Sequence, residues 1–396
     1  MYGIHWIVNR AGTTMKIIAD RNIPLAKEVF SHLGGVELVP GREISPAVVR
    51  DADILVVRSV TTVDRPLLSG SSVRFVATST IGTDHIDREY LDTRGIGFAY
   101  APGSNAQSVA EYVCTALVYC SRKYSFDLKD KALGIVGVGN IGKRVLLTAR
   151  VLGMQCLCND PPRARKEGPS EFVPLDMLLP EADIVTIHVP LTREGTDATF
   201  RMVDETFLRR MKTGALLFNT SRGQVVDERV LKKTRAKLGG LVLDVWQDEP
   251  SIDADLLGMT DGGTPHIAGY SYDGKINGTG MVYEAACDFL GQEPRWKPSD
   301  HLDTIAIREL SPSSPPVDPL GDLILQAYPI GRDIADMRQL ASLRTQEQGE
   351  YFAWLRENYA LRLEFNHFSV NARLNNGAML TASVREKLAG LGFQLK

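Results

Sequence analysis

Several features that would place a chain of this length in a special class are missing from the sequence. No apolar run approaches the roughly 20 residues that a membrane-spanning helix needs. Only 5 cysteines occur among 396 residues, and no C-x-x-C pattern is present. An odd number of scattered cysteines argues against a disulfide framework and against a zinc site. We therefore expect reduced thiols, no bound metal and a cytoplasmic location.

A large excess of charge of either sign is also missing. The 45 Lys and Arg residues and the 48 Asp and Glu residues leave a formal net charge of −3. Such a surface does not attract nucleic acid or an anionic membrane, so we expect neither as a partner. An anionic substrate would have to be held by local basic groups. The apolar content of 44% is ordinary for a globular protein, and the length predicts two or three domains.

The first 14 residues have neither the basic start nor the cleavage pattern of a signal peptide. They precede "MKIIAD", which is typical of the first strand of an α/β domain. We therefore interpret residues 1–14 as a non-native or misassigned leader and Met15 as the functional start.

From Met15 onward, short β-branched runs alternate with helical stretches, which is typical of parallel sheets covered by helices on both faces. A second alternating set begins near residue 132. After the Pro/Ser-rich run "ELSPSSPPVDP" the amino-acid composition becomes more polar. The sequence thus predicts an α/β protein of two Rossmann-like, doubly wound parallel-sheet domains and a small C-terminal α+β domain. The expected ranges are 15–110 with 270–295 for the substrate-binding domain, 111–269 for the dinucleotide-binding domain and 300–396 for the C-terminal domain.

A glycine fingerprint, G-V-G-N-I-G, begins the second set with Gly137, Gly139 and Gly142. It follows a strand-like run and opens a helix-like run, and Asp160 ends the next strand. In this context the glycines allow a pyrophosphate to approach a helix N-terminus, and the carboxylate accepts ribose hydroxyls. Because Asp160 would repel a 2′-phosphate, we expect NAD. Arg163 and Arg165 could hold that phosphate instead, although loop charges in solvent are the simpler interpretation.

Three polar features follow later strand-like runs. Arg222 lies after "GALLFN", Asp244 with Glu249 after "GGLVL", and His266 within "TPHIAGY". Because strand carboxyl ends face the ligand crevice in open α/β sheets, these groups can converge on a bound nicotinamide. An arginine can clamp a carboxylate, and a histidine oriented by a carboxylate can accept a hydroxyl proton. The set fits hydride transfer from a 2-hydroxy acid.

With these motifs the sequence resembles the D-isomer-specific 2-hydroxyacid dehydrogenases. The resemblance rests on "GIVGVGNIG", "HVPLT", "NTSRGQVVD", "LDVWQDEP" and "PHIAG", and covers about residues 15–290. It implies that Arg222, Glu249 and His266 are catalytic.

The segments "VVRSVTTV", "ATSTIGTDHID", "NDPPRAR", "PHIAGYSYDGK" and "YFAWLRENY" narrow the resemblance to one branch of that family. Enzymes of that branch oxidise a four-carbon, 4-phosphorylated 2-hydroxy acid on a route to pyridoxal 5′-phosphate. They form homodimers through their C-terminal domain. The resemblance implies that the substrate is bound by Ser59, Thr80 and Tyr270. It also implies that NAD is bound by Gly137, Gly139, Asn140, Ile141, Gly142, Asp160, Val189, Thr220, Ser221, Arg222, Asp244 and Gly269. The branch more often has Cys than Ser at position 221.

The phosphate of such a substrate needs a cation, and Arg58, beside Ser59 at the end of a strand-like run, is our candidate. The alternative is an Arg58 that is paired with a nearby carboxylate such as Asp84. Two other functions also remain open at this point. The chain could oxidise a different substrate such as 3-phosphoglycerate, or it could be an NAD-sensing scaffold without activity.

Overall fold

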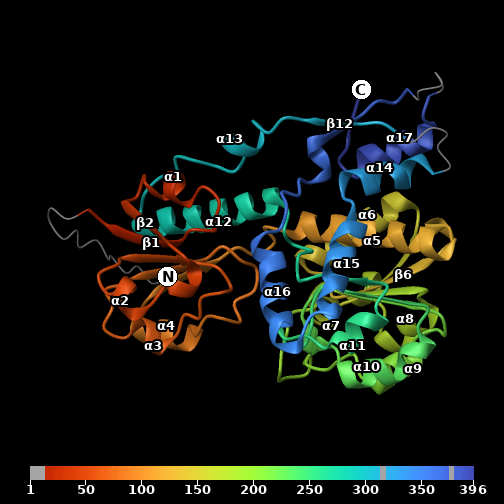
Figure 1. Ribbon diagram of the computed structural model, residues 1–396, viewed down its shortest axis with the longest axis horizontal. Coiled ribbons are helices and arrows are strands. Elements are labelled where there is room, and N and C mark those ends of the chain that lie inside the picture. Colours follow the sequence, from red (N-terminus) through yellow and green to blue (C-terminus); the bar gives the residue numbers. More distant parts are fainter. Residues whose placement is uncertain (1–13, 313–317, 374–378) are drawn as a thin grey trace. The chain divides into compact units, whose positions relative to one another are not determined.

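The computed structural model describes residues 14–312, 318–373 and 379–396, so nearly all of the expected leader lies outside the described residues. The chain forms two compact units, and each is made of two stretches of sequence. The first unit comprises residues up to 105 together with 272–305. The second comprises 106–271 together with 306–396 (Figure 1).

The first unit is built on a five-stranded parallel sheet in the order β2-β1-β3-β4-β5. Its strands are β1 (Lys16–Asp20), β2 (Gly35–Val39), β3 (Ile54–Val57), β4 (Phe75–Thr78) and β5 (Gly97–Tyr100). Its helices are α1 (Ala26–Phe30), α2 (Pro46–Val49), α3 (Arg65–Leu68), α4 (Arg88–Arg94), α12 (Tyr272–Leu290) and α13 (Ser299–Leu302).

One face of this sheet is covered by α12, a helix from far along the chain (Figure 1). Val282, Tyr283 and Cys287 of α12 are fully buried against strand residues such as Ile17 and Ile54. The central strands β3 and β4 are buried along their whole length, as expected for parallel strands with both faces covered.

The second unit contains a six-stranded parallel sheet in the order β11-β10-β9-β8-β6-β7. Its strands are β6 (Ala132–Val136), β7 (Gln155–Asn159), β8 (Ile184–Ile187), β9 (Leu216–Asn219), β10 (Gly240–Leu243) and β11 (Gly262–Gly263). Its helices before residue 271 are α5 (Ala106–Tyr124), α6 (Asn140–Leu152), α7 (Pro161–Glu167), α8 (Leu175–Glu181), α9 (Glu205–Arg210), α10 (Glu228–Thr234) and α11 (Ala254–Met259). The strand order turns back after β6, which is the doubly wound arrangement that the sequence predicts.

The C-terminal segment of the second unit has a small parallel sheet of its own, in the order β12-β13-β14. Its strands are β12 (Arg308–Leu310), β13 (Phe368–Val370) and β14 (Gln394–Leu395), and its helices are α14 (Pro319–Ala327), α15 (Ile330–Arg338), α16 (Thr345–Glu357) and α17 (Ala382–Gly390). Phe352 and Leu355 of α16 join the same buried core as Trp246, which follows β10. The C-terminal segment thus shares the core of the dinucleotide-binding sheet.

Candidate active site

The glycine loop connects β6 to α6 and has the shape that a dinucleotide needs. Gly137 has a φ of +87°, and a Cβ there would lie 2.7 Å from the His188 carbonyl oxygen. A Cβ at Gly142 would lie 2.0 Å from the Gly137 carbonyl oxygen, so this helix position also requires glycine. At Gly139, the N-cap of α6, a Cβ would meet nothing within 4 Å. The loop therefore fits a pyrophosphate at the helix N-terminus, with open space beside Gly139.

Asp160 lies at the end of β7, as its predicted role requires. Its carboxylate accepts hydrogen bonds from the Val138 backbone N–H (2.8 Å) and from the Arg163 N–H (3.1 Å), the second as the N-cap of α7. Each carboxylate oxygen can accept a further bond, so ribose hydroxyls can still be bound. Asp160 therefore also ties the glycine loop to the neighbouring helix.

The two arginines after Asp160 are occupied by other partners within the protein. Arg163 donates from Nε to Glu167 (2.8 Å) and from Nη1 to the Val138 carbonyl oxygen (2.7 Å). Arg165 forms an ion pair with Asp197. Both guanidinium groups would have to give up carboxylate partners to bind a 2′-phosphate, which agrees with the expected preference for NAD.

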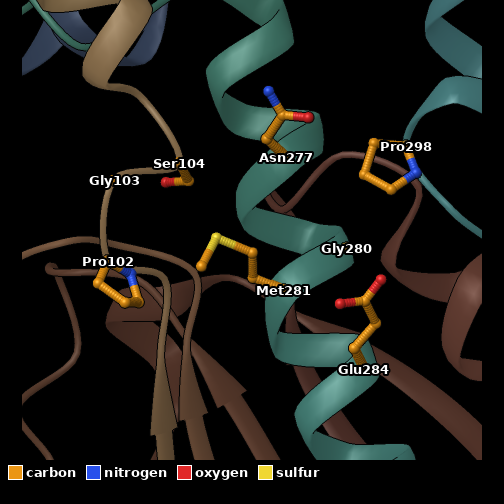
Figure 2. Close-up of a pocket in the computed structure, with 8 residues that line it drawn as sticks. All are labelled: Pro102, Gly103, Ser104, Asn277, Gly280, Met281, Glu284 and Pro298. Atoms are coloured by element: carbon orange, nitrogen blue, oxygen red, sulfur yellow. The ribbon is translucent and has the colours of Figure 1, made fainter. Parts of the chain in front are cut away.

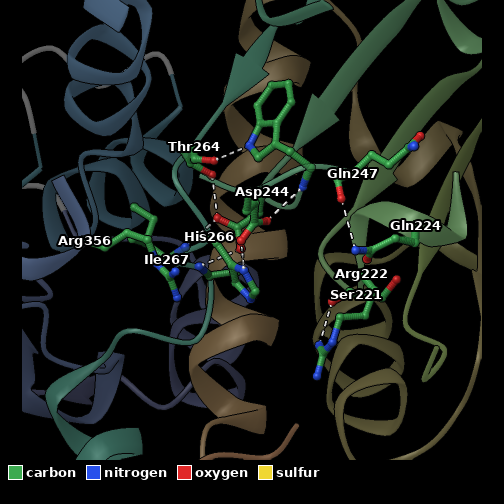
Figure 3. Close-up of polar contacts among 12 residues, drawn as sticks. Ser221, Arg222, Gln224, Asp244, Gln247, Thr264, His266, Ile267 and Arg356 are labelled. Atoms are coloured by element: carbon green, nitrogen blue, oxygen red, sulfur yellow. Dashed lines mark hydrogen bonds and ion pairs between the residues drawn. The ribbon is translucent and has the colours of Figure 1, made fainter. Parts of the chain in front are cut away.

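His266 and Glu249 form the central pair of the site, and His266 is labelled in Figure 3. The His266 Nδ1 lies 2.7 Å from Glu249 Oε2, and the other carboxylate oxygen accepts from the Trp246 N–H (2.9 Å). Burial alone would raise the pKa of Glu249, but the charge and hydrogen bond of His266 and the charge of Arg356 hold it below the ordinary value. An ionised Glu249 orients the imidazole and leaves Nε2 for a substrate.

The backbone at His266 is unusual for a residue with a side chain. Its φ is +56°, in the left-handed region that favours glycine, and its N–H donates to the Asp244 carbonyl oxygen (2.7 Å). Sparsely populated backbone conformations of this kind persist where the surroundings fix them, often at functional sites.

Asp244 supplies that fixation, because its fully buried carboxylate binds the turn around His266. It accepts from the Ile267 N–H (2.7 Å), the Ala268 N–H (3.0 Å) and the Thr264 hydroxyl (2.7 Å). Burial raises the pKa of Asp244, although these bonds and the charge of His266 oppose the effect. The residue expected to contact NAD thus shapes the histidine loop as well.

Arg222 follows β9, next to the strand that leads to Asp244. Its Nη1 donates to the Ser221 carbonyl oxygen (2.8 Å), and Asn219 fixes the turn by donating to the Arg222 carbonyl oxygen (3.0 Å). The next residue is Gly223, where a Cβ would lie 1.9 Å from the backbone carbon of Trp246. The Arg222 loop and the loop after β10 are therefore packed backbone to backbone.

Two residues near the site were not predicted from the sequence. His188, directly before Val189, is buried between Thr186 and Thr220, whose hydroxyls lie 2.9 and 3.2 Å from its ring nitrogens. Burial lowers the pKa of His188 to about 3, so the ring is neutral. The position of His188 in the "HVP" run, directly after β8, is the feature of the sequence that could have indicated it. The second residue is Arg356 of α16, which donates to the Tyr270 hydroxyl (2.9 Å).

The other predicted substrate residues, apart from Tyr270, belong to the first unit. Arg58 donates from Nε to the fully buried carboxylate of Asp20 (3.1 Å) and forms an ion pair with it. Ser59 is exposed in the next position. The Thr80 hydroxyl donates to the Gly82 carbonyl oxygen (2.9 Å) and contacts Thr78.

A pocket of about 250 Å³ lies elsewhere in the first unit, between α12 and the segment after β5 (Figure 2). Its lining includes Ser104, Asn277, Met281 and Glu284. Its only titratable lining group is the carboxylate of Glu284, which would repel an anionic substrate. None of the predicted catalytic residues lines it.

Comparisons with known proteins give the family. The model of the D-isomer specific 2-hydroxyacid dehydrogenase, NAD binding domain, matches residues 110–268. The erythronate-4-phosphate dehydrogenase of Salinibacter ruber is 47% identical over 369 residues, which are 90% of this chain and 94% of that protein. The enzyme of the same name from Chromohalobacter salexigens is 43% identical over 389 residues, which are 96% and 99%. This chain belongs to the erythronate-4-phosphate dehydrogenase family.

Solved structures of other dehydrogenases resemble this member of the erythronate-4-phosphate dehydrogenase family. The D-lactate dehydrogenase of Aquifex aeolicus, complexed with NAD and lactic acid, has a TM-score of 0.59 at 26% identity, covering 70% of this chain and 95% of that one. The NAD-bound 3-phosphoglycerate dehydrogenase of Entamoeba histolytica has a TM-score of 0.61 at 25% identity, covering 72% and 98%. The expected fold, family and NAD-binding domain are thereby confirmed.

Two negative findings concern the described part of the chain. None of its helices is both long and apolar enough to cross a membrane. Among the same residues, no group of three or more His, Cys, Asp or Glu side chains is arranged to hold a metal ion.

Proposed function

We propose that this chain oxidises 4-phospho-D-erythronate to (R)-3-hydroxy-2-oxo-4-phosphooxybutanoate with NAD, in the biosynthesis of pyridoxal 5′-phosphate. The observation that carries the proposal is the hydrogen bond between His266 and Glu249, at the carboxyl end of the dinucleotide-binding sheet. A purely NAD-sensing scaffold would not need an imidazole oriented by a carboxylate. The substrate follows from relatives that match the chain over nearly its whole length.

In this proposal His266 removes the proton of the 2-hydroxyl group through Nε2, while Glu249 stabilises the imidazolium that forms. Arg222 binds the substrate carboxylate and polarises the forming carbonyl oxygen. Bound NAD supplies the acceptor for the hydride that leaves C2.

The residues proposed to hold NAD are those that the fingerprint and the family resemblance indicate. The glycine loop and the N-terminus of α6 would face the pyrophosphate, and Asp160 would accept the adenosine ribose hydroxyls. Val189, Thr220, Ser221, Asp244 and Gly269 would complete the nucleotide site on the neighbouring loops.

Arg58, Ser59, Thr80 and Tyr270 are proposed to bind the substrate. Arg58 keeps this role as a proposal although Asp20 already neutralises part of its charge. We also propose that the protein is a cytoplasmic homodimer that is held together by residues 300–396.

The test is an assay of NAD reduction by the purified protein against a panel of 2-hydroxy acids. 4-Phosphoerythronate should give the highest kcat/KM, with 3-phosphoglycerate and unphosphorylated erythronate far behind. A preference for 3-phosphoglycerate would assign the protein to another member of the fold. NAD binding without turnover of any member of the panel would identify a sensing protein.

A further inference from the structure

Helix α16 of the C-terminal segment packs against both loops that carry the proposed acid–base pair. Gly349 faces the segment directly after Glu249, where a Cβ would lie 3.2 Å from Ser251 Oγ and 3.8 Å from Pro250. Arg356, two turns further along the helix, reaches Tyr270 on the loop after His266. The buried side chains between them, Phe352 and Leu355, anchor the helix in the core that also contains Trp246.

Arg356 is placed in an environment that an arginine with only a structural role would not require. Its Nη2 donates to the Tyr270 hydroxyl (2.9 Å), and its guanidinium lies 5.4 Å from the centre of the same ring. Its Nε is buried and has no hydrogen-bond partner among the described residues. No ion pair of Arg356 is found within the described residues. In the view of Figure 3, His266 is drawn between Arg222 and Arg356.

We propose that Arg356 is a positioning residue of the active site, which holds Tyr270 in place and brings a positive charge to the acid–base pair of Glu249 and His266. The inference rests on the proposed function, because it assigns Arg356 to the acid–base pair of that reaction. It makes the C-terminal segment a part of the catalytic machinery as well as a candidate dimer contact.

The electrostatics agree with this geometry. The charge of Arg356 is one of the causes that hold the pKa of Glu249 below its ordinary value, and the charge of Glu249 in turn raises the pKa of Arg356 against the effect of burial. Asp244, from the end of β10, is the other carboxylate that acts on Arg356. Arg356 is therefore a cation that the C-terminal helix adds near Glu249 and Asp244.

The expected effect of removing this cation has a defined sign. His266 and Glu249 are hydrogen-bonded, and loss of a neighbouring positive charge makes such a pair bind protons more readily. The oxidation needs the deprotonated pair, so the acid limb of kcat/KM should move to higher pH in Arg356→Gln. We expect a shift of about 0.5–1 pH unit and a loss of kcat on the order of tenfold.

Arg356→Lys separates the charge from the shape of the side chain. Lysine keeps the positive charge but cannot stack and donate as the planar guanidinium does. It should lower kcat and leave the acid limb near its wild-type position. The matched control is Arg344→Gln at the N-cap of the same helix, because Arg344 is 82% exposed and pairs with Glu347. This control should keep both kcat and the pH profile, and Tm and NADH binding should be measured for all three variants.

A readout without turnover separates this inference from the proposed function. The chain has 7 histidines, and an NMR titration can follow the His266 signal, identified by its loss in His266→Ala. The titration of this signal should move to higher pH in Arg356→Gln even if no substrate is known. An unchanged titration and an unchanged acid limb in a folded Arg356→Gln protein would overturn the inference. Failure of wild-type turnover with a shifted titration would instead overturn only the proposed function.

Discussion

His266 has a side-chain role and a backbone role that can be separated by substitution. If its imidazole accepts the 2-hydroxyl proton, His266→Ala should lower kcat by about 10²–10⁴-fold. The affinity for NAD should change little, because the glycine loop and Asp160 lie on other elements. Stopped-flow measurement of NADH formation and a fluorescence titration of NADH give the two quantities. Near-normal turnover would show that another group is the base.

Asp160 also has two roles, because it caps α7 and is proposed to accept hydrogen bonds from the adenosine ribose hydroxyls. Asp160→Asn should keep only one of the two backbone hydrogen bonds, because Val138 and Arg163 donate to different carboxylate oxygens, and it should lose the negative charge that repels a 2′-phosphate. The expected result is weaker NAD binding and a narrower preference over NADP. The KM values for both cofactors in wild-type and variant protein measure it. A wild-type preference for NADP would make Arg163 and Arg165 the residues that read this site.

The buried carboxyl group of Glu228 should make the stability of the protein depend on pH. Burial raises its pKa to about 7, from 4.5. Between these values the folded state binds more protons than the unfolded state, so this group makes the free energy of unfolding fall as pH rises. The difference corresponds to about 3 kcal/mol at most above pH 7. Glu228→Gln should therefore raise Tm at pH 8 and have little effect at pH 4, as calorimetry can establish. An equal gain at both pH values would point to packing instead of ionisation.

At the residue scale, the predicted site residues that follow a strand carry a local signal in the sequence. Arg222, Glu249 and His266 each lie shortly after a recognisable apolar run, and the hydrogen bond between the last two agrees with the predicted convergence. Arg356 could not be found in this way, because it lies on an amphipathic helix that is distant in sequence and has no local sign of its partner. The second role of Asp244, which is to bind the turn around His266, could not be predicted either. A sequence pattern does not show which backbone groups a carboxylate will bind.

At the scale of elements, the approach of two loops depends on one glycine. A Cβ at Gly223 would overlap the backbone of Trp246, which is covalently held and cannot rotate away. Gly223→Ala should separate the Arg222 loop from the loop after β10, reducing kcat/KM by about tenfold or more through misplacement and lowering Tm. Gly258→Ala in α11 is the matched comparison, since its Cβ would meet nothing within 4 Å and its φ is not restrictive. A Gly223→Ala protein with full activity would contradict this account.

The strands were the most predictable elements, and the short helices the least. The quoted strand-like runs "MKIIAD", "GALLFN" and "GGLVL" contain β1, β9 and β10, because buried parallel strands are continuous apolar runs. Helix α1 has five residues, and α2 and α3 have only four each, too few to show a helical period. Helices of this size are fixed by packing and by caps such as Asp64, whose carboxylate accepts from the Leu67 N–H (3.0 Å).

For the whole molecule, the proposed homodimer can be tested by measuring the molecular mass in solution. Light scattering of the full chain should give twice the 43.6 kDa of one chain. A monomer at micromolar concentration would contradict the proposal. Truncation near Ser311 is a harsher test, because it removes Arg362, which is buried and binds Ser108 on α5. The truncated chain should lose thermal stability as well as its partner.

The first unit is interrupted by the second, and this order has a consequence for synthesis on the ribosome. Its core includes Val282, Tyr283 and Cys287, about 270 residues after Ile17, while strands β1 to β5 emerge within the first hundred residues. At translation rates of about 5–20 residues per second, the sheet waits on the order of tens of seconds for its covering helix. During that interval an apolar sheet face is open to other nascent chains, so recovery of active protein should depend on how quickly translation reaches α12 and on the holding chaperones present.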